Sequence, residues 1–505
     1  MDAFTHLLAG FSVAAQPINL GYVFLGCLLG TVIGMLPGIG PAAGIALLLP
    51  ITYGIEPTSS LIMLCGIYYG AMYGGSTTSI LINTPGESSS VMTALDGYAM
   101  ARGGRAGAAL AIAAIASFIA GTASVVLLSL LAIPLAGFAL KFGPAEYFTL
   151  MLFAMTSVAA LTGASLARGL LAMFLGLMLA TVGIDLQSGQ QRYTFDLPEL
   201  QDGIGFIVVV VGLFAIAEVF CGLEDHLRGR AEIIRLSGRL WLTRDEWRRS
   251  RMPIVRGTGI GFFKGVLPGA GATIATILSY SIERMLSRTP EKFGTGMIEG
   301  VAGPEAANNA STGGAMVPLL TLGVPGSGST AVLLAAFIMY GLQPGPMLFE
   351  KRPDLVWGLI ASMYIGNVVL LILNLPLVGL FVRLLYIPTG LLLPMVISIS
   401  AIGIFAVNGN IFELYLALGF GVLGYAFRKL AIPVAPLVLS LVLGGIMEQS
   451  FRQAMTISGA DPGVFVKSPI CVVLLLCSAI ALSVPLLAPL FRRFTAGRSA
   501  MPAAR

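Results

Sequence analysis

Long apolar segments recur along this chain, and they constrain its fold more than any other feature. Separate runs of about 20 hydrophobic residues, the length that spans a hydrocarbon core, are divided by short polar stretches. Of the 505 residues, 56% are hydrophobic and only 10% are charged, whereas soluble domains carry about 25% charged residues. A chain so poor in charge cannot cover a water-facing surface. We therefore expect an all-α polytopic membrane protein, and we exclude an ordinary soluble enzyme.

The remaining composition narrows the class of membrane protein. The 63 Gly and 28 Pro are typical of proteins whose helices break at membrane depth, as in transporters. The five Cys form no CxxC pair, and His6 and His226 are the only histidines, so we expect neither a disulfide framework nor a transition-metal site. The net charge of +5 is interpreted as an orientation signal and not as a nucleic-acid footprint.

Charge placement predicts the topology. The segment 223–256 is the one long polar stretch and carries nine Arg against five acidic residues, so the positive-inside rule places it in the cytoplasm. Tracing back through a span at 203–222 leaves 185–202, with four acidic residues and one Arg, outside. Alternation of the remaining spans puts the N-terminus outside and the C-terminus inside. The long span at 355–382 is expected to enter from outside.

Two motifs occur twice along the chain. Gly34-Met-Leu-Pro-Gly-Ile-Gly40 matches Gly265-Val-Leu-Pro-Gly-Ala-Gly271 at five of seven positions, and Thr84-Pro-Gly-Glu-Ser-Ser-Ser90 aligns with Val324-Pro-Gly-Ser-Gly-Ser-Thr330. With the predicted topology the halves are inverted, as in many secondary transporters. The predicted organisation is a first membrane repeat at 1–222 with a helix-break core at about 18–101, a cytoplasmic connector at 223–256, a second repeat at 257–447 with a core at about 257–345, and an extra span at 468–491.

The first pair of breaks lies at Pro37-Gly38 and Pro268-Gly269. Proline removes a backbone donor and glycine permits left-handed angles, so each motif interrupts its helix. Arg284 follows the second motif and stays cytoplasmic only if the chain turns back there. This favours a re-entrant hairpin, while a kinked span is the alternative.

The second pair of breaks, at 83–86 and 324–327, precedes Ser and Thr residues that cap helix N-termini. A half-helix N-terminus inside the membrane presents free N–H groups and about +0.5 charge, which suits a carboxylate, while unwound carbonyls and side-chain oxygens suit Na⁺. The alternative is that these residues simply cap helices at a loop outside the membrane. The adjacent amides Asn308 and Asn309, in the 303–309 segment, are explained equally well by a helix cap and by contact with a ligand or ion. The candidate substrate-binding residues are Thr84, Pro85, Gly86, Ser88, Ser89, Asn308, Asn309, Gly326, Ser327, Ser329 and Thr330. The candidate ion-binding residues are Gly38, Gly40, Asn83, Thr84, Gly269, Gly271 and Val324.

Missing motifs exclude other functions. The chain contains no GxxxxGK[ST] phosphate loop, no GxSxG nucleophile motif and no HExxH zinc motif, so we predict neither ATP hydrolysis nor catalysis. An ion or anion channel and an H⁺-coupled carboxylate carrier remain as alternatives to a Na⁺-coupled carrier.

Several long motifs resemble one known family, the TctA-type large membrane subunits of the tripartite tricarboxylate transporters. They are Ile33-Gly-Met-Leu-Pro-Gly-Ile-Gly-Pro41, Gly66-Ile-Tyr-Tyr-Gly-Ala-Met-Tyr-Gly-Gly75, Asn83-Thr-Pro-Gly-Glu87, Leu95-Asp-Gly-Tyr98, Pro304-Glu-Ala-Ala-Asn-Asn-Ala310 and Leu320-Thr-Leu-Gly-Val-Pro-Gly326. The resemblance covers nearly the whole chain. Ser88 and Ala99 depart from it, since Pro is frequent at both positions in the family.

The resemblance implies a function and partners. It implies a permease of the bacterial inner membrane that imports citrate-like di- or tricarboxylates by symport with a cation, commonly Na⁺, with no other cofactor. Its partners would be a small membrane subunit, a periplasmic solute-binding protein and the lipid bilayer, without nucleic acid. A periplasmic N-terminus, a cytoplasmic C-terminus and alternating access are expected, and homo-oligomerisation is left open.

Overall fold

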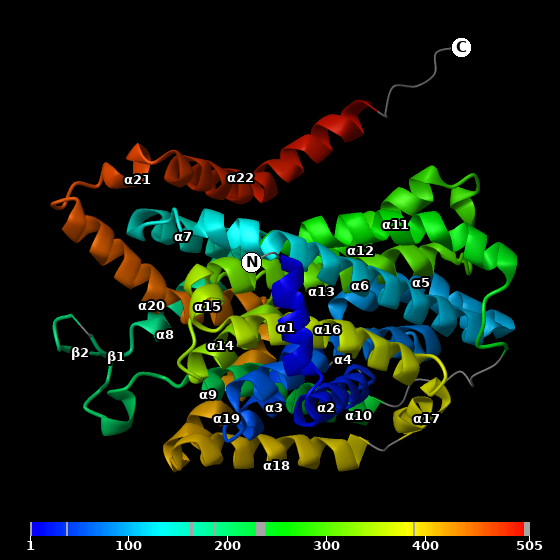
Figure 1. The fold of residues 1–505 in the computed structure, drawn as a ribbon, viewed down its shortest axis with the longest axis horizontal. Helices are drawn as coiled ribbons and strands as arrows, with labels where there is room; N and C mark the ends of the chain where they lie inside the picture. Colours follow the sequence, from blue (N-terminus) through cyan, green and yellow to red (C-terminus); the bar gives the residue numbers. More distant parts are fainter. Residues whose placement is uncertain are drawn as a thin grey trace. The chain divides into compact units, whose positions relative to one another are not determined.

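Helices dominate the computed structural model, which describes residues 3–36, 39–161, 165–185, 187–228, 238–269, 271–386 and 389–498 (Figure 1). Among these residues, eight helical segments are long and apolar enough to cross a membrane: Pro17–Gly34, Ser88–Ala139, Pro144–Leu161, Phe206–Glu224, Pro353–Asn374, Ile411–Lys429, Val434–Ile457 and Pro469–Leu486. The predicted all-α polytopic class is confirmed.

The chain divides into two compact units, residues 1–140 with 205–426 and residues 141–204 with 427–505. The first unit contains α1 (Ala3–Ala14), α2 (Pro17–Gly34), α3 (Pro41–Leu48), η1 (Leu49–Thr52), α4 (Pro57–Ile82), η2 (Ser88–Ser90), α5 (Val91–Met100), η3 (Ala101–Arg105), α6 (Ala106–Ala139), α9 (Phe206–Val210), η5 (Val211–Ile216), α10 (Ala217–Arg228), α11 (Arg244–Val266), α12 (Gly271–Leu286), η6 (Pro290–Lys292), α13 (Glu299–Leu322), α14 (Gly328–Met339), α15 (Pro346–Lys351), α16 (Pro353–Asn374), α17 (Val378–Val382), η7 (Arg383–Tyr386), α18 (Thr389–Asn408) and most of α19 (Ile411–Lys429). The second contains α7 (Pro144–Leu161), α8 (Leu166–Ala180), β1 (Gly183–Ile184), β2 (Gln191–Arg192), η4 (Pro198–Leu200), α20 (Val434–Ile457), α21 (Val464–Lys467) and α22 (Pro469–Arg498). These two units are defined by packing and do not test the predicted repeat boundaries, which stay a prediction.

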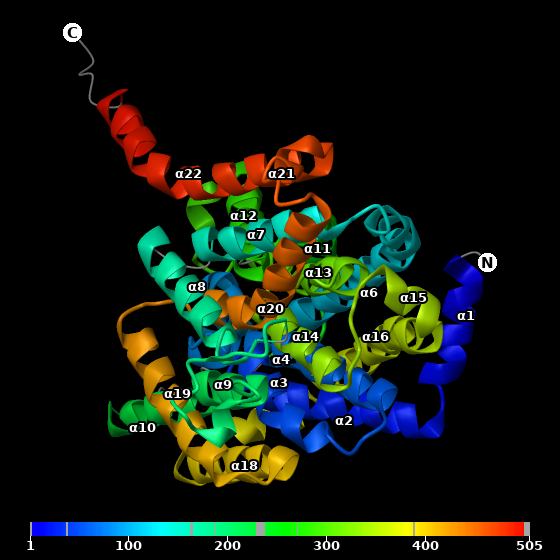
Figure 2. The ribbon, with the colours of Figure 1, turned by 90° about the vertical axis from the view of Figure 1, so that its left-hand side faces the viewer.

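Two helices, α4 and α13, form the centre of the first unit. Every residue at positions 58–82 of α4 and 300–321 of α13 is buried. Both helices are rich in small and hydroxyl residues and lie within protein, where polar groups at membrane depth are tolerated. Around them pack α2, α6, α11 and α16, and α1 lies along α16, where His6 stacks on Trp357 (Figure 2).

Glycine stripes bring the central helices into backbone contact with their neighbours. A Cβ at any of these glycines would lie 2.3–2.5 Å from a carbonyl oxygen of the facing helix, so only glycine fits. On α2 the pairs are Gly26 with Met63, Gly30 with Ile67 and Gly34 with Ala71 of α4, and on α11 they are Gly257 with Gly303, Gly261 with Ala307 and Gly265 with Ser311 of α13. The two sets match position by position, so the same local packing occurs twice.

The helices that flank the first pair of breaks form hairpins. Arg256 on α11 pairs with Glu283 on α12, 27 residues later, with 2.5 Å between Nη2 and Oε2, so the two helices run antiparallel (Figure 1). Gly44 on α3 likewise lies against Ile33 on α2. In each half, the helix after the motif thus packs back against the helix before it. Re-entry into the membrane stays a prediction.

One predicted span ends earlier than expected. The segment 355–382 was expected to be continuous, but α16 ends at Asn374 and α17 begins at Val378. Pro376 lies between them. Its missing N–H and its restriction on the preceding residue explain the interruption.

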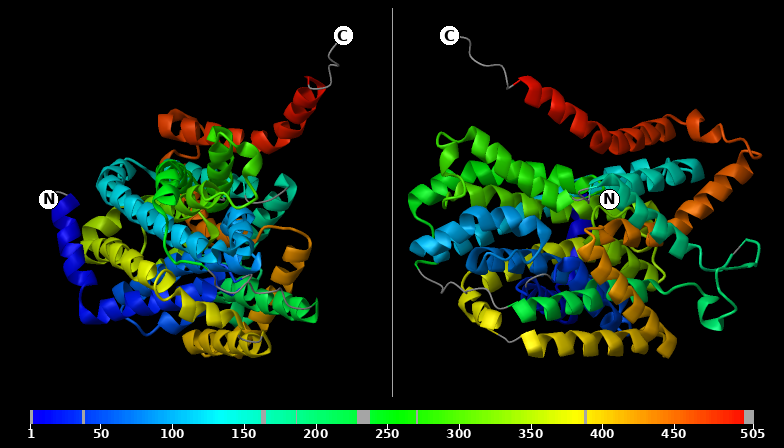
Figure 3. Two further views of the ribbon diagram at one scale, coloured as in Figure 1. Left: turned by 90° about the vertical axis from the view of Figure 1, so that its right-hand side faces the viewer. Right: turned by 180° about the vertical axis from the view of Figure 1, so that it is seen from behind.

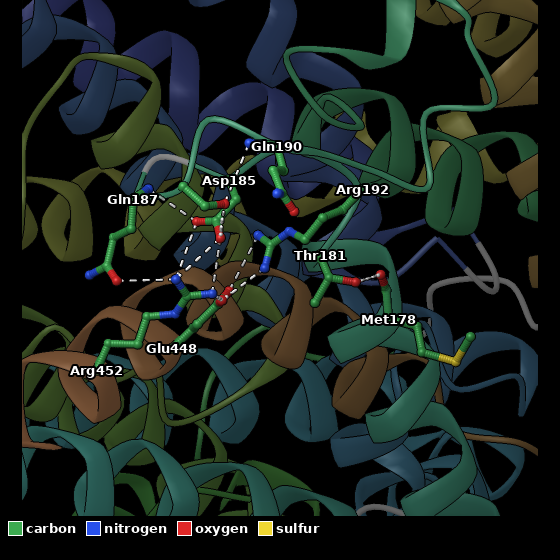
Figure 4. A network of polar contacts seen from close by, with 9 residues as sticks. Met178, Thr181, Asp185, Gln187, Gln190, Arg192, Glu448 and Arg452 are labelled. Carbon is green, nitrogen blue, oxygen red and sulfur yellow. Dashed lines mark hydrogen bonds and ion pairs between the residues drawn. The ribbon is translucent and has the colours of Figure 1, made fainter. Parts of the chain in front are cut away.

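In the second unit, a loop that carries the β1–β2 hairpin extends away from the helices of that unit (Figures 1 and 3). A polar network ties this loop to α20 (Figure 4). Arg452 on α20 contacts Asp185 at 3.2 Å and Glu448 at 2.5 Å, and Arg192 on β2 contacts Glu448 at 2.8 Å. Two arginines therefore neutralise Glu448 and Asp185 at the base of the loop.

The pKa of Asp185 is lowered to about 2, because its carboxylate accepts hydrogen bonds from the Gln187 backbone and the Ser188 hydroxyl and lies beside Arg452. An unfolded Asp has a pKa of about 3.9. The stabilisation from this carboxylate is therefore complete above about pH 4 and is lost as the pH falls through about 2.

Replacing Arg452 with Ala should loosen the loop. Exposed ion pairs contribute little individually, so we expect amide hydrogens of residues 183–192 to exchange about two to five times faster, measured by hydrogen–deuterium exchange in detergent. The control is Lys467→Ala, which breaks the exposed Lys467–Asp461 pair in the same unit. An unchanged rate in Arg452→Ala would show that the network does not hold the loop.

Candidate functional site

The second pair of breaks has the same backbone pattern in both halves. The C-cap residues of α4 and α13 are Asn83 (φ 53°) and Gly323 (φ 69°), which are both left-handed and lie 240 positions apart. A capped helix follows each break. The Ser90 hydroxyl accepts the N–H of Glu87 at 3.4 Å, and the Thr330 hydroxyl accepts the N–H of Ser327 at 2.8 Å.

The glycines of these breaks touch the first pair of breaks. A Cβ at Gly86 would lie 2.4 Å from the carbonyl oxygen of Gly34, and one at Gly326 would lie 2.8 Å from that of Gly265. The N–H of Gly269 also donates to the carbonyl of Gly326 at 3.2 Å. Each half therefore brings its own two breaks together.

Contacts between the halves join the four breaks into one region. Asn308 Nδ2 on α13 donates to Glu87 Oε1 at 3.0 Å, and the Ser88 hydroxyl lies 2.9 Å from that of Thr273 on α12. The contacts thus reach from the α13 helix and from the start of α12 to the break that precedes α5.

The structure places the predicted residues as follows. Of the substrate candidates, Gly86, Ser89, Asn308, Asn309, Gly326, Ser329 and Thr330 are buried, Thr84, Pro85 and Ser327 are partly exposed, and Ser88 is exposed. Of the ion candidates, Gly269, Gly271 and Val324 are buried, Gly40 and Thr84 are partly exposed, Asn83 is exposed, and Gly38 lies outside the described residues. Asn309 points away from the breaks, since its Nδ2 donates to Ser117 at 2.7 Å. The binding roles of these residues stay predictions.

The two helix N-termini differ in charge. Glu87 precedes the first, and its Oε1 accepts from Ser89 Oγ at 2.5 Å as well as from Asn308. Ser327 holds the matching position before α14. An anion is therefore favoured at the N-terminus of α14 and repelled by Glu87 at the other.

The sequence analysis missed a buried carboxylate at Glu305 of α13. This residue has no exposed surface. Ser76 Oγ on α4 lies 2.8 Å from both carboxylate oxygens, Ser117 Oγ on α6 donates to Oε2 at 3.1 Å, and Thr93 on α5 donates to Oε1. Three hydroxyl groups from three helices thus surround one carboxylate.

A small cavity lies beside Glu305. It has a volume of about 10 Å³, enough for one water-sized particle. Tyr73 and Asn374 line it, and both are buried. Within the part of the chain that the structure describes, the Tyr73 hydroxyl and the Asn374 Oδ1 have no hydrogen-bond partner. The cavity is therefore bordered by oxygen atoms that have unused bonding capacity.

Asp96 has a structural environment that the sequence did not indicate. Asp96 is fully buried. Its Oδ1 accepts the backbone N–H groups of Gly294, Gly296 and Met297 at 2.7–2.9 Å, and its Oδ2 accepts the hydroxyl of Tyr280 at 2.9 Å. Asp96 thus fastens the end of α5 to the turn that leads into α13.

The sequence contains a signal that could have identified Glu305 as a functional residue. It lies in the 303–309 motif, one helical turn before the paired amides, and an acidic residue within a long buried helix marks a functional site by default. Its partners could not be found in this way, because they lie 188–229 positions away.

Comparisons with known proteins agree with one another. The model of the Tripartite tricarboxylate transporter TctA family matches residues 20–439. An Agrobacterium vitis protein described as "Uncharacterized 52.8 kDa protein in TAR-I ttuC' 3'region" is 49% identical over 475 residues, 94% of each chain. A second, "Uncharacterized protein in TAR-II ttuC' 3'region" from the same organism, is 47% identical over 215 residues, 43% of this chain and 89% of that protein. No solved structure matches the chain.

Proposed function

The chain belongs to the tripartite tricarboxylate transporter TctA family, and we propose that it is the permease of a binding-protein-dependent carrier for citrate-like carboxylates, coupled to inward movement of Na⁺. Membership of the family implies a small membrane subunit and a solute-binding protein as partners. We place the complex in a bacterial inner membrane, with a periplasmic N-terminus and a cytoplasmic C-terminus.

The gathering of four helix breaks around α4 and α13 is the observation that supports this proposal. Broken helices inside a membrane protein supply unpaired backbone groups for ligands. The breaks touch within each half through Gly86 and Gly326 and between halves through Asn308 and Glu87. Alternating access around this region is part of the proposal.

Ion coupling supplies the driving force without nucleotide hydrolysis. Each elementary charge that crosses about 100 mV releases about 2.3 kcal/mol. Cations in excess of the negative charge of the substrate can therefore drive accumulation.

Uptake into proteoliposomes tests the function. The vesicles would hold this chain and its small subunit, with the binding protein and radiolabelled citrate outside. We expect uptake that requires both the binding protein and an inward Na⁺ gradient. Flux far above carrier rates without the binding protein would indicate a channel, and uptake driven by a proton gradient alone would indicate an H⁺-coupled carrier. If the binding protein does not bind citrate, only the choice of substrate is wrong.

The charge difference between the two helix N-termini predicts where the substrate carboxylate binds. Ser327→Asp would place a second carboxylate at the start of α14, where Asp caps a helix as well as Ser does. Because opposed like charges cost several kcal/mol, we expect citrate uptake to fall at least about tenfold with an unchanged melting temperature.

The matched control is Ser165→Asp, which introduces the same group at the N-cap of α8 in the second unit. It should leave uptake unchanged. Equal uptake by Ser327→Asp and the control would remove the α14 N-terminus from the substrate site.

A further inference from the structure

Glu305 is a buried charge that the protein alone does not neutralise. Among the described residues, no Lys, Arg or His forms an ion pair with it. Three hydroxyl donors surround the carboxylate, but hydrogen bonds leave its negative charge in place. A carboxylate without exposed surface needs a cation or a proton.

The surroundings of Glu305 fit a cation better than a further hydrogen-bond donor. Tyr73 and Asn374 line the adjacent cavity, and each has a buried oxygen, Oη and Oδ1, that finds no hydrogen-bond partner among the described residues. An amide oxygen such as that of Asn374 can only accept a hydrogen bond or bind a cation. Serine and threonine hydroxyls have lone pairs as well as a proton, so they can rotate to present oxygen to an ion.

Charge and size narrow the choice of ion. One carboxylate balances one positive charge, and oxygen ligands of this kind select hard cations over transition metals. The cavity of about 10 Å³ holds a single small ion without its water shell. A dehydrated monovalent cation of the size of Na⁺ meets all three conditions.

We propose that Glu305, with Ser76, Thr93, Ser117 and the facing oxygens of Tyr73 and Asn374, forms a Na⁺ site inside the first unit. That this site couples ion movement to transport rests on the proposed symport function. Its residues differ from the ion-binding residues predicted at the breaks. Helices α4, α5, α6, α13 and α16 each contribute an oxygen. Asn309 donates to Ser117 and so orients one of the ligands.

The position of the site gives a physical link between the ion and the substrate. Glu305 and Asn308 are on the same turn of α13, and Asn308 holds Glu87 at the break. The carboxylates of Glu87 and Glu305 both repel an anion. Na⁺ at Glu305 removes part of that repulsion, so ion and carboxylate should each raise the affinity for the other.

Direct binding of ²²Na⁺ to the purified full chain, measured by scintillation proximity, tests the site without a transport assay. We expect Glu305→Gln to bind one Na⁺ fewer per chain than the wild type. Glu299→Gln is the control, because it makes the same change on the same helix at a partly exposed ion pair with Arg249. Equal Na⁺ counts in Glu305→Gln and wild type, or no Na⁺ bound by wild type, would overturn the site.

A second variant tests the site independently, in case Glu305→Gln does not fold. Ser117→Ala removes one ligand and should weaken Na⁺ binding about tenfold, while Ser129→Ala removes another buried hydroxyl of α6 and should not. Wild-type Na⁺ affinity in Ser117→Ala would contradict the ligand set. Citrate uptake in proteoliposomes separates the two proposals: Na⁺-driven uptake that Glu305→Gln retains overturns the site alone, and absence of carboxylate uptake by wild type overturns the function alone.

Discussion

Asp96→Ala should destabilise the first unit by about 4 kcal/mol. The substitution removes the acceptor of three backbone N–H groups and of the Tyr280 hydroxyl. A buried donor left without a partner costs about 1–3 kcal/mol, and the four costs are less than additive because the turn is partly exposed and can relax. We expect the melting temperature in detergent to fall by about 8 °C.

Asp96→Asn separates anchoring from proton transfer. Asn keeps the oxygen that accepts the three N–H groups, and its amide can donate to Tyr280, so the loss should be about 1–2 kcal/mol. Uptake by this variant should stay near that of the wild type. Uptake lost together with its pH dependence, at wild-type stability, would instead identify Asp96 as a proton carrier. Asp354→Ala, at a half-exposed ion pair, is the control and should change stability by less than about 0.5 kcal/mol.

Gly86→Ala should abolish uptake, with a loss of at least about 100-fold. The new Cβ would lie 2.4 Å from the carbonyl oxygen of Gly34 and 2.5 Å from the Cα of Gly75. Both are backbone atoms, so a side-chain rotation cannot relieve the clash and the two breaks must separate. Overpacking of this kind typically costs about 1–3 kcal/mol, which should also lower the melting temperature.

Gly326→Ala should have a smaller effect, about tenfold on uptake, because its Cβ would lie 2.8 Å from the Gly265 carbonyl and 3.2 Å from the Ala315 Cβ. Gly21→Ala provides the comparison, since a Cβ there has no neighbour within 4 Å and Ala favours a helix. Wild-type uptake and melting in Gly86→Ala would show that the breaks do not need this contact.

Local sequence signals predicted those parts of the fold that depend on local chemistry. Apolar length identified the spans, and paired Pro and Gly identified all four breaks, because both effects act within a few residues. The position of Arg284 favoured a hairpin over a kinked span, and the packing of α12 against α11 agrees with that preference. The early end of α16 was missed although Pro376 was visible, since the apolar run continues past it.

The candidate site was predictable only as a set of separate segments. Ser, Thr and Asn near the breaks were recognised from capping chemistry, but their pairing depends on how α4 crosses α13. Asn308 and Asn309 show this clearly, because the adjacent amides reach Glu87 and Ser117 on different helices. The contacts of Glu305 and Asp96 could not be predicted for the same reason. A carboxylate acquires its role from donors that lie far away in the sequence.

The glycine stripes have a mechanical consequence. Because backbone packs directly on backbone at the glycines between α2 and α4 and between α11 and α13, neither pair can slide along its own length without carbonyls and Cα atoms colliding. Bending would then occur at the Pro-Gly segments at the ends of these helix pairs. A large rearrangement would rotate the α2–α4 pair and the α11–α13 pair as rigid bodies relative to each other, and the packing inside each pair would stay unchanged.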